Sequence, residues 1–372
     1  MFLHHSTSFK ASSALYSFTT QSFTTAGVAG RYGPTLAQCK TAYAASSWTA
    51  NSLYFNMTTQ GYQLWTVPAT GVYNFLIAGS RAGIYPGQHY TGGSNIGFGA
   101  QVQARLSLTI NQVITIICGS NTEATNTNNI NTYLGLGGGG GTFVSNGSTL
   151  LLAAGGGGGD GLYLNQSSQR FFGTGGQLRT QGALSVCDSF FLQSLGGTNG
   201  DGGYVSSATH QYNGGAGGGW LSSGMNGNTT RTHPFSQTPY YGEGGYTYSN
   251  GFYGGDTNWQ WGNPSGFPAS AGGFGGGGGG NGIIGGGGGG GYSGGGAGQG
   301  APLSGTFTGA AGTGGGGGGS YIISSATNVG TSTGTFEGIS TFNNVVIQNL
   351  GSTNYPFFGF NNSSGFVTVT KI

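Results

Sequence analysis

Charge is the scarcest property of this chain. Only 4% of its 372 residues are charged, nine Lys and Arg against seven Asp and Glu. The basic residues stand singly, at Lys10, Arg31, Lys40, Arg81, Arg105, Arg170, Arg179, Arg231 and Lys371. Binding to nucleic acid needs clustered basic side chains that neutralise phosphates, so we expect no nucleic-acid partner. A surface with so little charge is poorly protected against association, which predicts that much of it is buried in an assembly.

Cysteine is also scarce. The chain has three, Cys39, Cys118 and Cys187, far apart and without C-x-x-C spacing. This spacing matches no zinc or iron–sulfur pattern, and we expect neither a metal nor a cofactor. Two states fit the count: one disulfide with a spare thiol, or three buried free thiols.

Long apolar runs are missing too. No stretch approaches the roughly 20 residues that a membrane-spanning helix needs, so we expect no membrane span. Residues 1–18 lack a basic segment followed by an apolar run, and no secretory signal is expected. A chain of this kind either stays in the cytoplasm or leaves it as part of an assembled particle.

Motifs of catalysis do not occur. The histidines form no H-E-x-x-H, and there is no phosphate-binding loop ending in Lys-Ser or Lys-Thr. The seven carboxylates include no closely spaced pair that suggests acid–base work. We therefore expect a protein that is not an enzyme, with no catalytic residues.

Glycine and aromatic residues are what the chain has in abundance, with 86 Gly and 13% Phe, Trp and Tyr. Disordered chains combine high charge with few aromatics, which is the reverse of this composition. The glycine runs lie at residues 137–141, 155–159, 275–280, 285–291 and 314–319. Flexible linkers, the alternative reading, are rich in Ser and poor in large apolar residues.

Polyproline II geometry explains how such runs can be ordered. It has three residues per turn and leaves the N–H and C=O groups pointing outward. Without side chains, neighbouring helices can approach and hydrogen-bond to one another. We predict a bundle of parallel and antiparallel polyglycine II helices. Apolar residues at the ends of runs, such as Tyr292, are expected to anchor it against a core.

The segments that flank the glycine runs have the pattern of β-strands. Residues 62–67 and 72–78 surround a Pro/Gly turn and predict a hairpin. Further strands are expected over residues 100–108, 113–118, 150–154, 320–323 and 366–370. Residues 34–43 predict one short helix that begins near Pro34.

These elements predict an all-β protein with at most one or two short helices. Residues 1–60 would form an N-terminal extension that carries the helix. Residues 60–136 and 320–372 would form a β-sandwich, and residues 137–319 a large glycine-rich insertion.

The order of motifs is recognisable. It begins with Trp65-Thr66-Val67-Pro68 and a strand that ends at Cys118-Gly119. Two glycine runs follow, one before Thr142-Phe143-Val144 and one after Leu150-Leu151-Leu152. The last motifs are Gly285–Gly291-Tyr292 and Gly365-Phe366-Val367. This order resembles the glycine-rich, ligand-binding extracellular region of the anaplastic lymphoma kinase and leukocyte tyrosine kinase receptors, over about residues 60–372. The resemblance implies a tumour-necrosis-factor-like jelly roll joined to a polyglycine II lattice, and a homotrimer.

Departures from that family limit what carries over. The chain lacks the many cysteines of a secreted receptor region, and no kinase domain is visible, so neither receptor function nor a cytokine partner is inferred. It is also similar to the glycine-rich tips of some bacteriophage tail fibres and to surface proteins of large DNA viruses. We therefore expect an extracellular component of a virion or particle surface, such as a minor capsid, spike or fibre-tip protein, with a role in host attachment or adhesion.

Other functions remain open at this point. One is a purely structural cement or scaffold protein, and another is a secreted glycine-rich matrix protein. The expected partners are further copies of the chain and other particle proteins. A cell-surface glycan or protein receptor is the expected ligand if the chain is an adhesin.

Tyr/Trp-rich loops between the glycine runs are the candidate binding site. Rigid aromatic side chains among Gly, Asn and Ser are typical of binding loops, and aromatic rings also stack on sugar faces. The candidate residues are Tyr240, Tyr241, Tyr246, Tyr248, Tyr253, Trp259 and Trp261. The alternative is that these rings pack within the lattice or between subunits.

Overall fold

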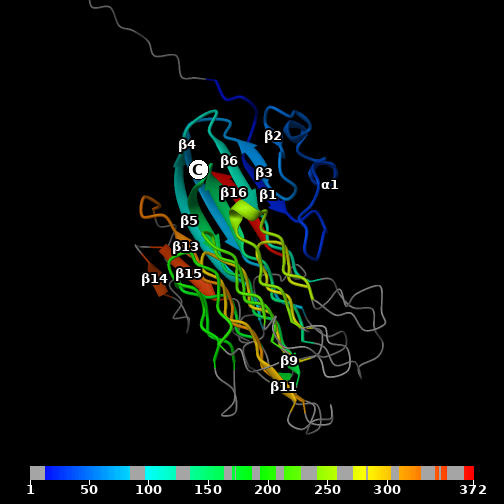
Figure 1. The fold of residues 1–372 in the computed structure, drawn as a ribbon. Coiled ribbons are helices and arrows are strands. Elements are labelled where there is room, and N and C mark those ends of the chain that lie inside the picture. The colour runs from blue at the N-terminus through cyan, green and yellow to red at the C-terminus, as the bar shows by residue number, and fades with distance from the viewer. Residues whose placement is uncertain are drawn as a thin grey trace, which may run out of the picture.

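The computed structural model describes residues 13–83, 97–122, 135–162, 170–171, 173–186, 193–206, 213–227, 241–257, 271–281, 284–302, 310–327, 340–342, 345–349 and 364–372. Over these ranges the chain forms two antiparallel β-sheets, and a long bundle of glycine segments extends from one end of them (Figure 1). The predicted all-β class with few helices is confirmed.

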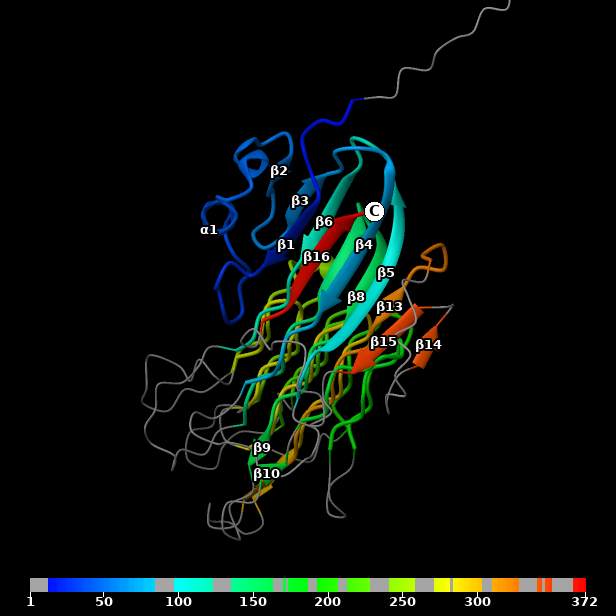
Figure 2. The same ribbon diagram turned by 180° about the vertical axis from the view of Figure 1, so that it is seen from behind.

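The first sheet has the strand order β1-β16-β4-β5-β15-β14. Figure 2 shows β1, β16, β4 and β5 side by side. The strands are β1 (Thr20–Thr24), β4 (Gly71–Ala78), β5 (Ala100–Leu108), β14 (Ser340–Phe342), β15 (Val345–Asn349) and β16 (Phe366–Lys371).

The second sheet has the order β13-β8-β7-β6-β3-β2. Its strands are β2 (Phe55–Asn56), β3 (Gln63–Thr66), β6 (Val113–Ile117), β7 (Thr142–Asn146), β8 (Thr149–Ala154) and β13 (Tyr321–Ile322). Two further pairs, β9 (Gly161–Leu162) with β10 (Arg170–Phe171) and β11 (Gly300–Pro302) with β12 (Ala310–Gly312), complete the strands.

The hairpin predicted across the Pro68 turn is wrong. β3 pairs with β2 and β6, whereas β4 pairs with β5 and β16 in the other sheet. The physical reason is that both strands carry large apolar side chains that must face each other across a core. Trp65 and Tyr73 meet there edge to face, with ring centroids 5.6 Å apart.

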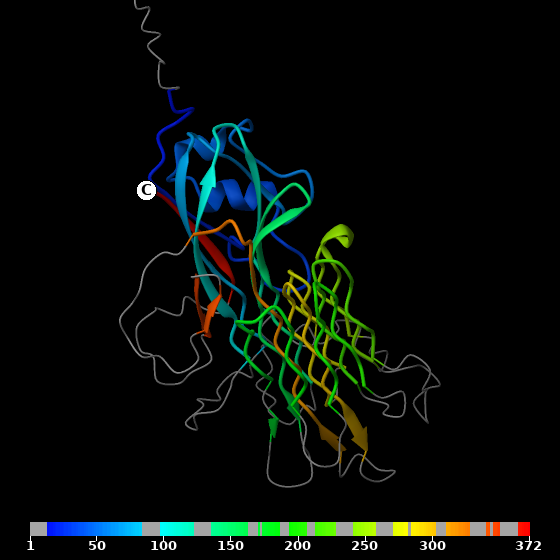
Figure 3. The same cartoon turned by 90° about the vertical axis from the view of Figure 1, so that its left-hand side faces the viewer.

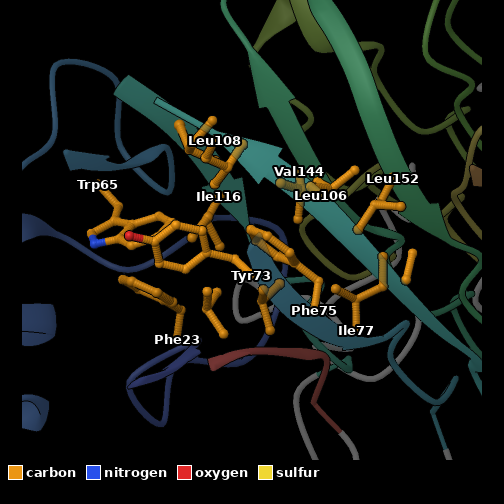
Figure 4. Close-up of a cluster of buried hydrophobic side chains, with 14 of the residues drawn as sticks. Phe23, Trp65, Tyr73, Phe75, Ile77, Leu106, Leu108, Ile116, Val144 and Leu152 are labelled. Atoms are coloured by element: carbon orange, nitrogen blue, oxygen red, sulfur yellow. The ribbon is translucent and has the colours of Figure 1, made fainter. Parts of the chain in front are cut away.

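That core lies between the two sheets, as Figure 4 shows. Alternate residues of β5, namely Val102, Ala104 and Leu106, are buried in it, which confirms the strand predicted over residues 100–108. The largest fully buried side chains of this core include Phe23, Trp65, Tyr73, Phe75 and Ile77. Burying each such side chain contributes about 1.5–3 kcal/mol.

The predicted helix is confirmed as α1 (Leu36–Ala42), which lies at the edge of the sandwich beside β1 and β2 (Figure 1). Thr35 and Gln38 form a capping box: the Gln38 N–H donates to Thr35 Oγ1 and the Thr35 N–H donates to Gln38 Oε1. Cys39 on this helix and Cys118 after β6 are buried free thiols. Cys187 lies outside the described residues.

The described residues also form two single-turn 3₁₀ helices, η1 (Ser47–Ala50) and η2 (Tyr248–Asn250).

The domain ranges expected from the sequence do not coincide with the sheets. β1 and β2 come from residues 1–60 and occupy edge positions of the two sheets. β7 and β8 come from residues 137–319 and lie inside the second sheet. The sandwich therefore draws strands from all three ranges, because the glycine run 137–141 leads directly into β7 and the run 155–159 follows directly on β8.

We call the extended segments below the sandwich the glycine lattice. It comprises residues 79–83, 97–99, 118–122, 135–141, 155–160, 173–186, 193–206, 213–227, 241–247, 253–257, 271–281, 284–299 and 313–320. Figure 3 shows the segments running side by side along one axis, away from the two sheets.

Hydrogen bonds in the lattice repeat every three residues. The N–H groups of Gly286, Gly289 and Tyr292 donate to the carbonyls of residues 313, 316 and 319. The N–H groups of the residues in between donate to other segments. Gly287 and Gly290 donate to the carbonyls of residues 136 and 139, and Gly288 and Gly291 donate to those of residues 215 and 218. Three residues per turn is polyproline II geometry, so the bonds follow the pattern predicted for polyglycine II helices.

The run 285–291 also accepts hydrogen bonds from three more segments. Residues 156 and 159 donate to it in antiparallel order, and residues 295 and 298 and residue 278 donate from two other sides. One run thus contacts six neighbouring segments, some parallel and some antiparallel. Each bond contributes about 0.5–1.5 kcal/mol, which offsets the cost of about 1–2 kcal/mol for ordering a residue.

Only glycine fits these contacts. A Cβ built on Gly287, Gly289 or Gly290 would lie closer than 3.0 Å to backbone atoms of a neighbouring segment. Gly71 in β4 is different, since a Cβ there would meet only the Lys371 side chain at 3.6 Å. The glycine content is therefore a packing requirement of the lattice.

The lattice joins the sandwich on the outer face of the second sheet. Ile117, Phe143 and Ala153 lie directly opposite one another on β6, β7 and β8. They pack against Trp220, Phe252 and Phe274 of the glycine-rich segments. Tyr292, at the end of the longest run, stacks on Tyr321 of β13 at 4.7 Å, which confirms that run-end residues anchor the bundle.

Candidate functional site

The candidate loop, residues 241–257, consists of two arms that are hydrogen-bonded to each other at the end of the lattice next to the sandwich. Glu243 N donates to Asp256 O at 2.7 Å, and Tyr246 N donates to Tyr253 O at 2.9 Å. The tip is η2 followed by Gly251, whose φ of 86° is in the left-handed region that favours glycine. The paired arms fix the positions of the aromatic side chains that they carry.

Tyr248 has a packing role. Its ring stacks on Trp220, with centroids 4.3 Å apart and 25° between the planes, and its hydroxyl donates to Gly147 O. Tyr62, which precedes β3, donates to the Tyr248 carbonyl at 2.6 Å. Burial raises the pKa of the Tyr62 hydroxyl, and the neighbouring hydroxyls of Tyr248 and Tyr253 raise it further. This group ties the loop to the second sheet.

Tyr246 and Tyr253 belong to a second group at the surface. Their ring centroids are 6.3 Å apart at 69°. Tyr253 also meets Tyr32, from the N-terminal segment, at 5.3 Å and 66°. Tyr32 is 52% exposed, and the other two rings are half-buried. The structure therefore brings together two of the predicted site residues and adds a third tyrosine to them.

Tyr241 belongs to neither group, and it is half-buried beside Gly227. Tyr240, Trp259 and Trp261 lie outside the described residues.

An ion-pair network borders the three surface tyrosines. Arg31 pairs with Asp256, and its second guanidinium nitrogen lies 3.3 Å from Glu243 Oε2. The Arg31 guanidinium also lies over the Tyr32 ring at 5.7 Å, within cation–π range. Arg31 Nε donates to Gly254 O at 2.9 Å, and Gly254 N donates to Arg31 O at 3.0 Å. These contacts hold the N-terminal segment around Arg31 against the candidate loop, residues 241–257.

We call this group the surface tyrosine cluster. It consists of Arg31, Tyr32, Glu243, Tyr246, Tyr253 and Asp256. No hydroxyl of its three tyrosines has a hydrogen-bond partner among the described residues, whereas the buried hydroxyls of Tyr43, Tyr62 and Tyr73 all have one. These phenol groups are available to an external ligand.

The sequence did not indicate Arg31 and Tyr32 as members. More than 200 positions separate them from Tyr253, and neither residue lies in an aromatic-rich stretch. The sequence feature that could have indicated this contact is the small number of charged residues, of which Arg31, Glu243 and Asp256 are three.

Comparison with known proteins gives no family: no protein-family model matches the chain, and no curated protein matches it significantly. Among the described residues, no three His, Cys, Asp or Glu side chains are grouped so that they could hold a metal ion. No helix in the described ranges is both long and apolar enough to span a membrane.

Proposed function

We propose that this chain is a non-enzymatic surface protein of a virion or comparable particle, and that it uses a rigid glycine lattice to present a binding surface for attachment. The observation that carries the proposal is the lattice itself. One run bonds to six neighbours with a period of three residues, and side chains are excluded from the contacts. A lattice of this kind is stiff and carries few charged residues, which suits an element that projects from an assembly.

The proposal includes a tumour-necrosis-factor-like jelly roll as the base. Two six-stranded antiparallel sheets support it, as do connections that pass from one sheet to the other between β3 and β4 and between β5 and β6. The pairing of β1 with β16, which lie near opposite ends of the sequence, also supports it. A homotrimer is part of the same proposal.

The test is competition for attachment. Excess recombinant chain should reduce attachment of the native particle to its host, and antibodies to the chain should label the outer surface of intact particles. Absence of labelling on particles that contain the protein would contradict a surface role. Labelling without any effect on attachment would leave a structural role.

One observation favours the alternative, a cement or scaffold protein. Leu184, Leu195, Tyr204 and Met225 lie on three neighbouring lattice segments, residues 173–186, 193–206 and 213–227, which are joined by hydrogen bonds such as Met225 N to Gly203 O at 3.1 Å. They are 37%, 57%, 43% and 48% exposed. A row of exposed apolar side chains marks an interaction surface.

Self-association through this row is testable. Leu195→Ser combined with Tyr204→Ser should lower the oligomeric state measured by light scattering without changing the melting temperature. An unchanged oligomer would show that the row is not the contact between copies.

A further inference from the structure

The surface tyrosine cluster has the chemistry of a binding site for an uncharged sugar. We propose that Tyr32, Tyr246 and Tyr253, with the carboxylates of Glu243 and Asp256, bind a neutral pyranoside. This inference rests on the proposed attachment function and names the ligand class that it would use.

Ring geometry is the first argument. Tyr253 meets Tyr32 at 66° and Tyr246 at 69°, so these rings contact edge to face and are not stacked flat on one another. Trp220 and Tyr248, in contrast, stack at 25° in the packed junction. With Tyr32 52% exposed, ring surface faces solvent. A pyranose presents a face of C–H groups that packs against such a ring.

Hydrogen-bond capacity is the second argument. Both recorded bonds to the Glu243 carboxylate go to Oε2, from Arg31 and from the Asp256 N–H. Oε1 receives none from any described residue. Carboxylate oxygens and tyrosine hydroxyls are acceptors and donors suited to sugar hydroxyls. A ligand that covered these polar groups without pairing them would bear a desolvation cost, so they would favour a ligand rich in hydroxyls over an apolar one.

Charge decides between kinds of sugar. The cluster holds two carboxylates and one guanidinium, so acidic groups outnumber basic ones. An acidic sugar would meet repulsion. A basic peptide is disfavoured because Arg31 already pairs with both carboxylates and lies over the Tyr32 ring, where a ligand cation would otherwise bind.

Rigidity is the third argument. The two arms that carry Glu243, Tyr246, Tyr253 and Asp256 are hydrogen-bonded to each other, and Arg31 is bonded to Gly254 in both directions. The side chains therefore stand on a fixed backbone. A preorganised site loses less conformational entropy on binding, which matters for weakly bound sugars.

The experiment uses the full chain and saturation-transfer NMR. The probes are lactose, maltotriose and N,N′-diacetylchitobiose as neutral sugars, sialyllactose as an acidic sugar and an oligo-arginine peptide. We expect transfer to at least one neutral sugar and none to the acidic sugar or the peptide. Tyr32→Ala and Tyr253→Ala should each weaken that binding about tenfold or more. Leu53→Ala, at a 75% exposed side chain outside the cluster and outside the row of exposed apolar residues, should leave it unchanged.

Three outcomes would overturn the proposal: no transfer to any neutral sugar, binding that survives both tyrosine substitutions in chains with unchanged melting temperature, or preference for the basic peptide. Glu243→Gln keeps the shape of the side chain and provides a variant in which folding is little disturbed. If Tyr253→Ala loses sugar binding but the chain still competes for attachment, the sugar is not the attachment ligand. If the wild-type chain does not compete at all, the proposed function itself fails.

Discussion

Phe143 of β7 and Phe252 of the candidate loop lie face to face, with ring centroids 4.3 Å apart and 16° between their planes. Both side chains are fully buried. This pair is the centre of the contact between the second sheet and the glycine lattice. Since glycine contributes no side-chain burial, the apolar stabilisation of the lattice is concentrated at such contacts.

Removing one of the two rings should therefore be costly. Phe252→Ala is expected to lower the free energy of unfolding by about 3–5 kcal/mol, as for other buried aromatic truncations. Urea denaturation measures it. Leu221→Ala is the control, because Leu221 is 64% exposed and its truncation should change stability by no more than about 0.5 kcal/mol. Equal effects of the two substitutions would contradict the packing described for Phe252.

A methyl group inside the lattice should be poorly tolerated. A Cβ on Gly289 would overlap the Gly156 carbonyl, so Gly289→Ala requires two segments to separate. We expect a loss of about 1–3 kcal/mol or more. Gly71→Ala is the matched control, and it should be neutral or stabilise by about 0.4–1 kcal/mol, because the position has room and alanine restricts the unfolded chain. Thermal melting of both variants distinguishes a packed lattice from a loose one.

Arg31 should stabilise the contact between the N-terminal segment and the loop. Arg31→Lys keeps the charge but loses the planar fork that reaches Glu243, Asp256 and Gly254 together. Because Asp256 is half-exposed, solvent screens the pairs, and we expect a loss of only about 1–2 kcal/mol. Arg179→Lys, the same change at an exposed position, is the control. Identical stability of Arg31→Lys and the wild type would show that the fork contributes nothing.

Stability should fall at alkaline pH. Burial raises the pKa of the Cys39 thiol from 9.0 to about 12 and also raises the pKa of Cys118. Below pH 9 both thiols keep their protons whether the chain is folded or not. Above it, the unfolded state loses protons that the folded state holds, so the free energy of unfolding decreases as pH rises from about 9 to 12.

Denaturation at a series of pH values measures this decrease. A Cys39→Ala variant should show a shallower one, and a free energy that stays constant across the range would contradict the burial of both thiols. Thiol labelling gives a second readout. In a Cys187→Ser background, Cys39 and Cys118 should resist alkylation until the chain is unfolded.

Much of the architecture was predictable because local patterns determine it. The alternation in β5, the capped helix near Pro34 and the period of three in the glycine runs each follow from side-chain spacing or its absence. The pairing of β3 and β4 was not predictable in the same way. A turn at Pro68 fits a hairpin and a corner between sheets equally well, and only the core that Trp65 and Tyr73 share decides between them.

The candidate site was predictable in part. Tyr246 and Tyr253 stood out by composition, but Tyr248 has the same local surroundings and packs against Trp220. The difference arises from which face of the paired arms meets the second sheet. Arg31 and Tyr32 come to the site through long-range hydrogen bonds to Gly254, and nothing in their own neighbourhood indicates that contact.

Hydrogen–deuterium exchange of the backbone amides of residues 285–291 measures whether the glycine lattice is ordered. Each of these amides from Gly286 on donates to another segment. We expect exchange slower by about a thousandfold or more than in an unstructured peptide, and close to the rate in β6. Exchange at the rate of an unstructured chain in a protein whose β-strands are protected would contradict an ordered lattice.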